Sequence, residues 1–168
     1  MEQWNAYTRD GKLTDKILIR GEVIPQGLYF MACEILVRHA DGDYLCMRRS
    51  VSKEKFGGYL EATAGGAALL GEDKYQCAKR ELKEETGLDC NEFHEIGAFV
   101  NDEYHSIFYS FECTVDCAKD SVRLQDGETE GYVWMSEAEF IDFVNSGNMI
   151  PTQYERHVEY FKKMGYIR

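Results

Sequence analysis

One segment, GGAALLGEDKYQCAKRELKEETGL from Gly65 to Leu88, restricts the fold of this chain more than any other. Asp73 is a residue type that caps the start of a helix, and Gly87 fits the left-handed position that ends one. Between these two positions, apolar residues recur at helical spacing: Tyr75, Ala78 and Leu82. The segment therefore predicts a glycine pair followed by a helix that lays one apolar stripe on a core.

The same helix carries a cluster of carboxylates at Glu81, Glu84 and Glu85. At about 100° per residue they fall within an arc of roughly 100° beside the apolar stripe. Like charges at this spacing destabilise a helix, and a solvated acidic face is the ordinary explanation. Clustered oxygen donors also suit a hard divalent cation such as Mg²⁺, with Mn²⁺ as an alternative.

Two further features of the segment favour the cation. Arg80 is the one arginine among the glutamates, and Glu72 in the preceding loop is placed to bend back onto it. The pair Gly65-Gly66 lets the backbone approach a ligand closely and offers carbonyl oxygens with no side chain in the way.

The remaining pattern predicts strands, then this helix, then strands and two more helices. Strands are expected over 30–37, 43–49, 58–64, 95–101, 106–115 and 130–136. Ser136 and Glu139 form a capping-box signature, and Pro151 opens a last helix that ends at Gly165. Residues 1–28 are expected to be an irregular lead-in. We therefore predict one α/β domain over residues 1–168, with a mixed sheet packed between helices.

The composition of the chain restricts the kinds of binding partner and the location that we expect. The 168 residues carry a net charge of −11, and there is no basic patch, so an extended nucleic acid is not an expected partner. The polar N-terminus lacks an apolar signal region, and no apolar run reaches the length of a membrane span. Six cysteines without paired CxxC spacing are expected to be reduced, which favours a cytoplasmic location. The oligomeric state is left open, with a homodimer as one option.

The spacing of residues 66–88 fits one pattern, Gly-x5-Glu-x7-Arg-Glu-U-x-Glu-Glu-x-Gly-U, where U is a bulky aliphatic residue. Seven positions demand a single residue type. At roughly one in fifteen each, chance gives on the order of 10⁻⁸ per starting position. This pattern is the signature of the Nudix hydrolases, and the segment resembles it at every defined position.

The resemblance implies an α/β/α sandwich and hydrolysis of the diphosphate linkage of a nucleoside diphosphate joined to another group. It implies divalent metal held mainly by Glu81 and Glu85, with Glu84 as a further contact and the Gly65 carbonyl completing the set. Arg80 would orient the glutamates, with Glu72 as its partner. Gly66 and Gly87 would have structural and not catalytic roles in the signature. Glu81 or Glu84 could also act as the catalytic base.

A finer resemblance links WNAYTRDG, GLYFMACEILV and MRRSVSKEKFGGYLEATAGG to isopentenyl-diphosphate isomerase and its Nudix relatives. The isomerase uses a cysteine before the signature and metal-binding histidines. Here Ala64 stands at the cysteine position, and Gly66 and Tyr29 stand at histidine positions. The hydrolase is therefore favoured over the isomerase, and a nucleotide-binding module without catalysis is the third reading.

Residues outside the signature supply further candidates. Arg48, Arg49, Lys53 and Lys55 form the densest basic group, and Arg49 and Lys53 are the favoured phosphate ligands. A solvated loop is the ordinary alternative.

A general base is expected from a loop, with Glu128 preferred and Glu130, Asp102 and Glu103 as alternatives. His105 could also face the site. Leu69 replaces a glutamate that is common in the family. Six aromatic residues could stack on a base: Tyr29, Phe30, Phe56, Tyr59, Tyr104 and Phe108.

Overall fold

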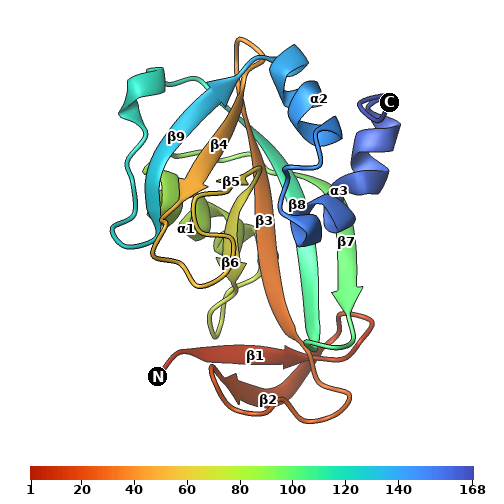
Figure 1. Cartoon of the computed structure of the whole chain (residues 1–168). Coiled ribbons are helices and arrows are strands. Elements are labelled where there is room, and N and C mark those ends of the chain that lie inside the picture. The colour runs from red at the N-terminus through yellow and green to blue at the C-terminus, as the bar shows by residue number, and fades with distance from the viewer.

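The computed structural model describes residues 1–168, and a mixed β-sheet between helices lies at its centre (Figure 1). The strands are β1 (Gln3–Tyr7), β2 (Leu13–Ile19), β3 (Phe30–His39), β4 (Tyr44–Arg49), β5 (Leu60–Glu61), β6 (Ala64–Ala67), β7 (His94–Asn101), β8 (Ser106–Val115) and β9 (Thr129–Met135). The helices are α1 (Lys74–Thr86), α2 (Glu137–Asn145) and α3 (Pro151–Lys163), with a 3-10 turn at Lys119–Ser121. The predicted α/β class is confirmed. No helix is both long enough and apolar enough to cross a membrane.

The main sheet has the strand order β5-β4-β3-β8-β7, with β6 also paired to β3 and β9 to β4. Strands β3 and β8 run parallel, and the other pairs are antiparallel. The single strand expected over 58–64 is instead two short strands. β5 pairs with β4, whereas β6 crosses to pair with β3, so Glu34 lies opposite Gly65. This crossing brings the glycine pair onto the central strand.

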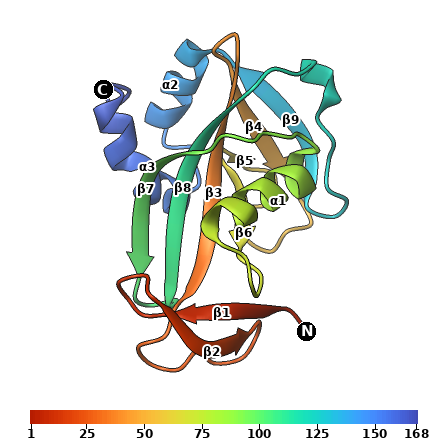
Figure 2. The same ribbon diagram turned by 180° about the vertical axis from the view of Figure 1, so that it is seen from behind.

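Both faces of the sheet are covered, as the unbroken apolar run in β3 predicts. Residues Met31, Cys33 and Ile35 belong to a core with Ala78 and Leu82 of α1. The alternate residue Leu36 belongs to a second core, formed with α2 and α3 around Phe140 and Phe161. Figures 1 and 2 show α1 on one side of the sheet and α2 and α3 on the other.

The apolar stripe of α1 differs from expectation at one residue. Ala78 and Leu82 are buried, but Tyr75 is 47% exposed, and Cys77 is buried in its place. The Tyr75 ring lies against Phe111, with ring centroids 5.4 Å apart, and the Lys74 ammonium lies 5.6 Å from its centroid. The first turn of α1 therefore contributes less to the core than the sequence spacing predicts.

The N-terminal segment is not the irregular lead-in that we expected. Strands β1 and β2 form an antiparallel hairpin, which lies across the end of β3 and β8 (Figure 1). Trp4, Ala6 and Leu18 are buried there and pack with Phe30 and Ala67. The alternation of apolar and polar residues in β1 is only five residues long, which is too short to stand out among polar neighbours.

Candidate active site

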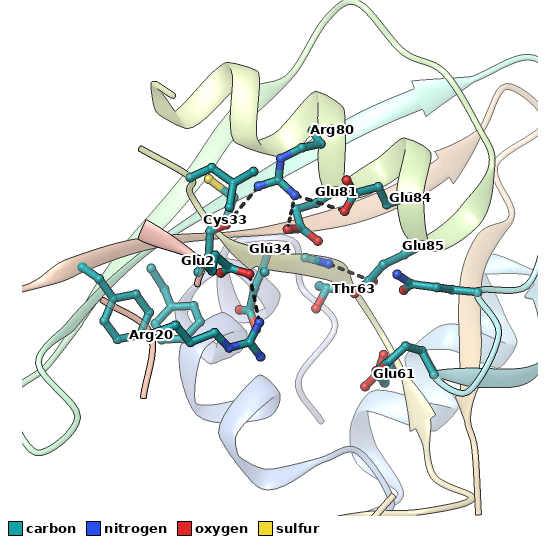
Figure 3. Close-up of a pocket in the computed structure, with 18 of the residues that line it drawn as sticks. Glu2, Arg20, Cys33, Glu34, Glu61, Thr63, Arg80, Glu81, Glu84 and Glu85 are labelled. Carbon is teal, nitrogen blue, oxygen red and sulfur yellow. Dashed lines mark hydrogen bonds and ion pairs between the residues drawn. The ribbon is translucent and has the colours of Figure 1, made fainter. Parts of the chain in front are cut away.

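A cleft of about 670 Å³ lies where α1, β6 and the N-terminal hairpin meet (Figure 3). The α1 glutamates, Arg80, the Gly65-Gly66 pair, Arg49, Lys53 and Glu128 line it, and residues from the hairpin, β3 and α3 join them. Its lining includes Glu2, Trp4, Arg20, Phe30, Glu34, Arg49, Lys53, Glu61, Thr63, Gly65, Gly66, Leu69, Arg80, Glu81, Glu84, Glu85, Phe108, Glu128 and Gln153.

Two caps set where α1 begins and ends. The Asp73 carboxylate accepts hydrogen bonds from the Tyr75 and Gln76 amides, at 2.9 and 2.8 Å, and the Gln76 side-chain oxygen accepts one from the Asp73 amide. Gly87 ends the helix with φ of 72°, a left-handed conformation that favours glycine. Both predicted caps are confirmed, and between them the helix presents its glutamates to the cleft.

The guanidinium of Arg80 joins the carboxylates together. Its Nε and Nη2 donate to the two Glu72 oxygens at 2.6 and 2.9 Å, as expected from their spacing. Its Nη1 donates to Glu81 at 2.6 Å and to Glu84 at 3.1 Å, and Nη2 also reaches the Ala67 carbonyl at 3.0 Å. Arg80 therefore holds the loop before α1 and two helix glutamates in one network.

The glycine pair fits tightly between β3 and α1. The Gly65 amide donates to Glu85 Oε2 at 3.0 Å. A Cβ atom at Gly65 would lie 2.0 Å from the Cys33 carbonyl oxygen, and one at Gly66 would lie 2.6 Å from Glu81 Oε1. No other residue type fits at either position without displacing the strand or the carboxylate.

Burial shifts the acid–base properties of these carboxyl groups. Burial, and then the charge of Glu61, raise the pKa of Glu85 well above its usual value, against the hydrogen bond from Gly65. Burial likewise raises the pKa of Glu81 and of Glu61, partly opposed by Arg80 and Arg49 respectively. The surroundings of these three carboxyl groups therefore disfavour their ionised forms.

This donor set has the chemistry of a hard divalent-cation site. Glu81, Glu84 and Glu85 offer carboxylate oxygens, which Mg²⁺ and Mn²⁺ prefer. As arranged here, no three His, Cys, Asp or Glu side chains are gathered into one metal-binding group. Arg80 holds Glu81 and Glu84, and the Gly65 amide holds Glu85. The donors fit a cation in type and burial, and they would have to exchange these contacts to bind one.

The candidate phosphate ligands reach the cleft in ion pairs. Arg49 pairs with Glu61, and Lys53 pairs with Glu128. Arg48 and Lys55 do not line the cleft. The favoured base, Glu128, therefore lies in the cleft, whereas Glu130 accepts a hydrogen bond from the Val51 amide and lies outside it.

Three other candidates, Asp102, Glu103 and His105, lie outside the cleft. Asp102 accepts bonds from Arg9 and Tyr29, each at 2.8 Å, and the Arg9 contact lowers the pKa of Asp102 to about 2. Arg9, Tyr29 and Asp102 line a separate, smaller cavity, and His105 lines it with them. Glu103 is exposed in the same turn and is not a cleft residue. Of the six candidate aromatics, only Phe30 and Phe108 line the cleft.

Several cleft residues were not identified from the sequence. Glu34 is buried on β3, and Arg156 of α3 donates to both of its oxygens, at 2.8 and 2.5 Å. A single glutamate inside the apolar run FMACEILV was the available signal. Glu2, Trp4 and Arg20 enter from the hairpin, which no sequence signal placed at the site.

Comparison with known proteins identifies the family. The family model described as the NUDIX domain matches residues 29–156, which is most of the chain. The chain belongs to the Nudix family. An uncharacterized Nudix hydrolase of Listeria innocua is 28% identical over 159 residues, which cover 90% of this chain and 89% of the relative. Nudix hydrolases are generally pyrophosphohydrolases of small molecules and generally use divalent metal ions.

Solved structures share the Nudix fold. A Deinococcus radiodurans crystal structure has a TM-score of 0.69 at 18% identity and covers 92% of this chain and 96% of its own. The NUDIX domain of Shewanella oneidensis NrtR, complexed with ADP ribose, has a TM-score of 0.55 at 14% identity. The match covers 68% of this chain and 77% of that domain structure. These likenesses show the fold, and the narrower isomerase-like branch is not confirmed.

Proposed function

We propose that this Nudix hydrolase is a divalent-metal-dependent pyrophosphohydrolase. Its substrate would be a nucleoside diphosphate joined to another group, cleaved at the diphosphate linkage. We also propose that residues 1–168 act as one domain, since the N-terminal hairpin and the signature helix line the same cleft.

The environment of the Glu85 carboxyl group carries this proposal. Glu85 is held by the Gly65 amide and has no cationic partner, while Glu61 raises its pKa further. A buried carboxylate without a countercharge costs stability, and a bound cation would offset that cost. Mg²⁺, with Mn²⁺ as an alternative, is the cation that such oxygen ligands favour.

We assign metal binding chiefly to Glu81 and Glu85, with Glu84 as a further ligand and the Gly65 carbonyl as the main-chain ligand. When bound, the metal would neutralise charge on the diphosphate and lower the pKa of the attacking water. Arg80 would keep the glutamates oriented through its fork of bonds to Glu72.

The remaining roles follow from the two ion pairs across the cleft. Arg49 and Lys53 would exchange their carboxylate partners for phosphate oxygens of the substrate. When Lys53 moves, Glu128 loses its partner and becomes free to accept the proton of the attacking water. Glu81 and Glu84 are the alternatives for that base. In-line attack would yield a monophosphate and a second phosphorylated fragment.

The isomerase reading gains no support from the positions that distinguish it. Ala64 is buried in β6, and Tyr29 lies outside the cleft and binds Asp102. Neither residue supplies the thiol or imidazole that alkene protonation would need.

The test is product release from nucleoside di- and triphosphates, nucleotide sugars including ADP ribose, dinucleotides and isopentenyl diphosphate. Each would be assayed with Mg²⁺, with Mn²⁺ and with chelator. We expect metal-dependent cleavage of at least one nucleotide, lost in Glu84→Gln and retained in Glu159→Gln, an exposed glutamate of α3. Tight nucleotide binding without turnover would instead favour the non-catalytic module.

A further inference from the structure

The N-terminal hairpin contacts the loop between β6 and α1, which belongs to the signature segment. The Leu70 amide in this loop donates to the Gln3 carbonyl of β1 at 2.8 Å. Ala67, the last residue of β6, packs against the buried hairpin cluster that contains Trp4. Figures 1 and 2 both show the loop extending from β6 toward β1. The hairpin therefore holds the loop through a main-chain hydrogen bond and an apolar contact.

The same loop supplies acceptors that hold the Arg80 guanidinium. Arg80 Nη2 donates to the Ala67 carbonyl at 3.0 Å, and both Glu72 oxygens accept hydrogen bonds from Arg80. The Glu72 carboxylate is fixed in turn by the Leu69 amide, which donates to its Oε2 at 2.9 Å. Ala67 therefore contacts both the hairpin cluster and Arg80, so a displaced hairpin would also displace acceptors of the guanidinium.

Arg80 extends this restraint to the carboxylates of α1. Its Nη1 donates to Glu81 at 2.6 Å and to Glu84 at 3.1 Å. A continuous series of packed and hydrogen-bonded groups thus joins the hairpin to two of the glutamates assigned to the metal. Groups that orient metal ligands without touching the metal affect its affinity, because they fix where the ligand oxygens lie.

Trp4 is the largest side chain in the buried hairpin cluster and is only 8% exposed. Its ring stacks on Phe30 of β3, with centroids 4.5 Å apart and an interplanar angle of 26°. Its Nε1 donates to Glu2 Oε1 at 2.7 Å. A rigid aromatic ring held in this way contributes a large buried contact area to the hairpin. Trp4 also lies outside residues 29–156, which the family model matches.

We propose that Trp4 is a positioning residue for the metal ligands of α1. Its packing fixes the hairpin against Ala67 and the loop before α1, and the loop fixes the Arg80 fork that orients Glu81 and Glu84. Trp4 acts through these groups and not by contact with the metal. The inference rests on the proposed function, which assigns a divalent cation to these glutamates.

Mn²⁺ binding by Trp4→Leu tests this role against a matched loss of core packing. Phe143→Leu is the control: Phe143 is 9% exposed, it packs in the second core, and no residue of α2 lines the cleft. Both variants should melt below wild type. At a temperature where circular dichroism shows both to be folded, Mn²⁺ affinity should fall about tenfold in Trp4→Leu only, the low end of the loss for groups that orient ligands.

A conservative variant and a metal titration separate positioning from loss of folded protein. Trp4→Phe keeps an aromatic ring on Phe30 and should bind Mn²⁺ within about twofold of wild type. Excess Mn²⁺ should restore the turnover of Trp4→Leu, because the defect lies in metal affinity. A loss of folded protein would instead lower turnover at every Mn²⁺ concentration.

Hydrogen exchange in the wild-type protein provides a second measurement that needs no variant. Coupling between two sites is reciprocal, so a metal site supported by the hairpin must also stabilise the hairpin contacts when metal binds. Mg²⁺ should therefore slow exchange of the Leu70 amide and of the β1 amides more than exchange of the α2 amides. Nuclear magnetic resonance resolves these amides individually.

Three results would overturn the inference: wild-type Mn²⁺ affinity in folded Trp4→Leu, an equal loss in Phe143→Leu, or equal slowing of exchange in β1 and α2. These results are distinct from failure of the proposed function. Absence of Mn²⁺ binding by the wild-type protein would contradict the proposed function, and the inference with it. Wild-type binding that Trp4→Leu leaves unchanged would contradict the inference alone.

Discussion

The Glu81 carboxylate lies directly against the α-carbon of Gly66, with no room for a side chain between them. A Cβ atom at Gly66 would stand 2.6 Å from Oε1 and 2.7 Å from Cδ of Glu81. Arg80 holds the same carboxylate at 2.6 Å. The position of this glutamate is therefore fixed from two directions, by a missing side chain and by a guanidinium.

Gly66→Ala should displace Glu81 and lower kcat by about 10²-fold, the order of loss expected when a reacting group moves by about 1 Å. The matched control is Gly97→Ala on β7, where an added Cβ meets nothing within 4 Å. Steady-state kinetics on both variants, with circular dichroism to confirm folding, makes the comparison. Equal activity in the two variants would show that the close contact has no functional role.

Arg80→Lys should lower both stability and activity. Lysine keeps the charge but cannot reproduce the forked bonds to Glu72 together with those to Glu81 and Glu84. Losing charged hydrogen bonds costs about 1.5–3 kcal/mol, which corresponds to a fall of several degrees in Tm. Arg168→Lys, which changes an exposed arginine paired with Asp142, should melt like wild type. Unchanged Tm in Arg80→Lys would contradict the role of the network.

Glu85→Gln should stabilise the metal-free protein at neutral pH. Glutamine keeps an oxygen for the Gly65 amide and removes a carboxyl group that has no cationic partner. Above the pKa of Glu85 we expect Tm to rise by about 2–4 °C, the shift that about 1 kcal/mol produces in a chain of this size. Thermal melts in the presence of chelator measure it, and Glu155→Gln, an exposed position on α3, serves as control.

The pH dependence of this difference has a definite sign. The folded protein raises the pKa of Glu85, so it binds more protons at this site than the unfolded chain, and stability falls as pH rises from about 4.3 through the folded pKa. The gap in Tm between Glu85→Gln and wild type should therefore widen as pH rises through the folded pKa of Glu85 and shrink toward pH 5. A gap in Tm that grows on acidification would contradict a raised pKa for Glu85 in the folded protein.

Glu128→Gln should lower kcat by about 10²- to 10⁴-fold if this residue is the general base, and it should remove the acidic limb of the pH–rate profile. Glu130→Gln, close in sequence but outside the cleft, is the control. A rise in KM with unchanged kcat would instead mean that Glu128 serves only to position Lys53, and Glu81 or Glu84 would then be the base.

Much of the signature segment could be predicted because its determinants are local. The caps at Asp73 and Gly87 and the pairing of Arg80 with Glu72 follow from spacing within one helix and its entry loop. The two-faced burial of β3 also followed from its continuous apolar run. Sequence spacing was a weaker guide at Tyr75, where contact with the sheet determines exposure.

Much of the remaining cleft lining could not be predicted because it comes from distant segments. Thr63, Gln153 and Trp4 line the same cleft only when β6 crosses to β3, α3 packs on the sheet and the hairpin lies across its end. No periodic pattern marks Gln153 as a cleft residue rather than an ordinary polar residue of α3. Long-range packing, and not local propensity, assembles this part of the site.

Mn²⁺ binding tests the central claim most directly, because that claim is that the α1 carboxylates are a divalent-cation site. Paramagnetic resonance counts free Mn²⁺ as wild type and Glu85→Gln are titrated, and Mg²⁺ competition shows whether the two ions share the site. We predict saturable binding to wild type that Mg²⁺ displaces and that is strongly weakened in folded Glu85→Gln. Equal binding by both proteins, or none by wild type, would contradict the account.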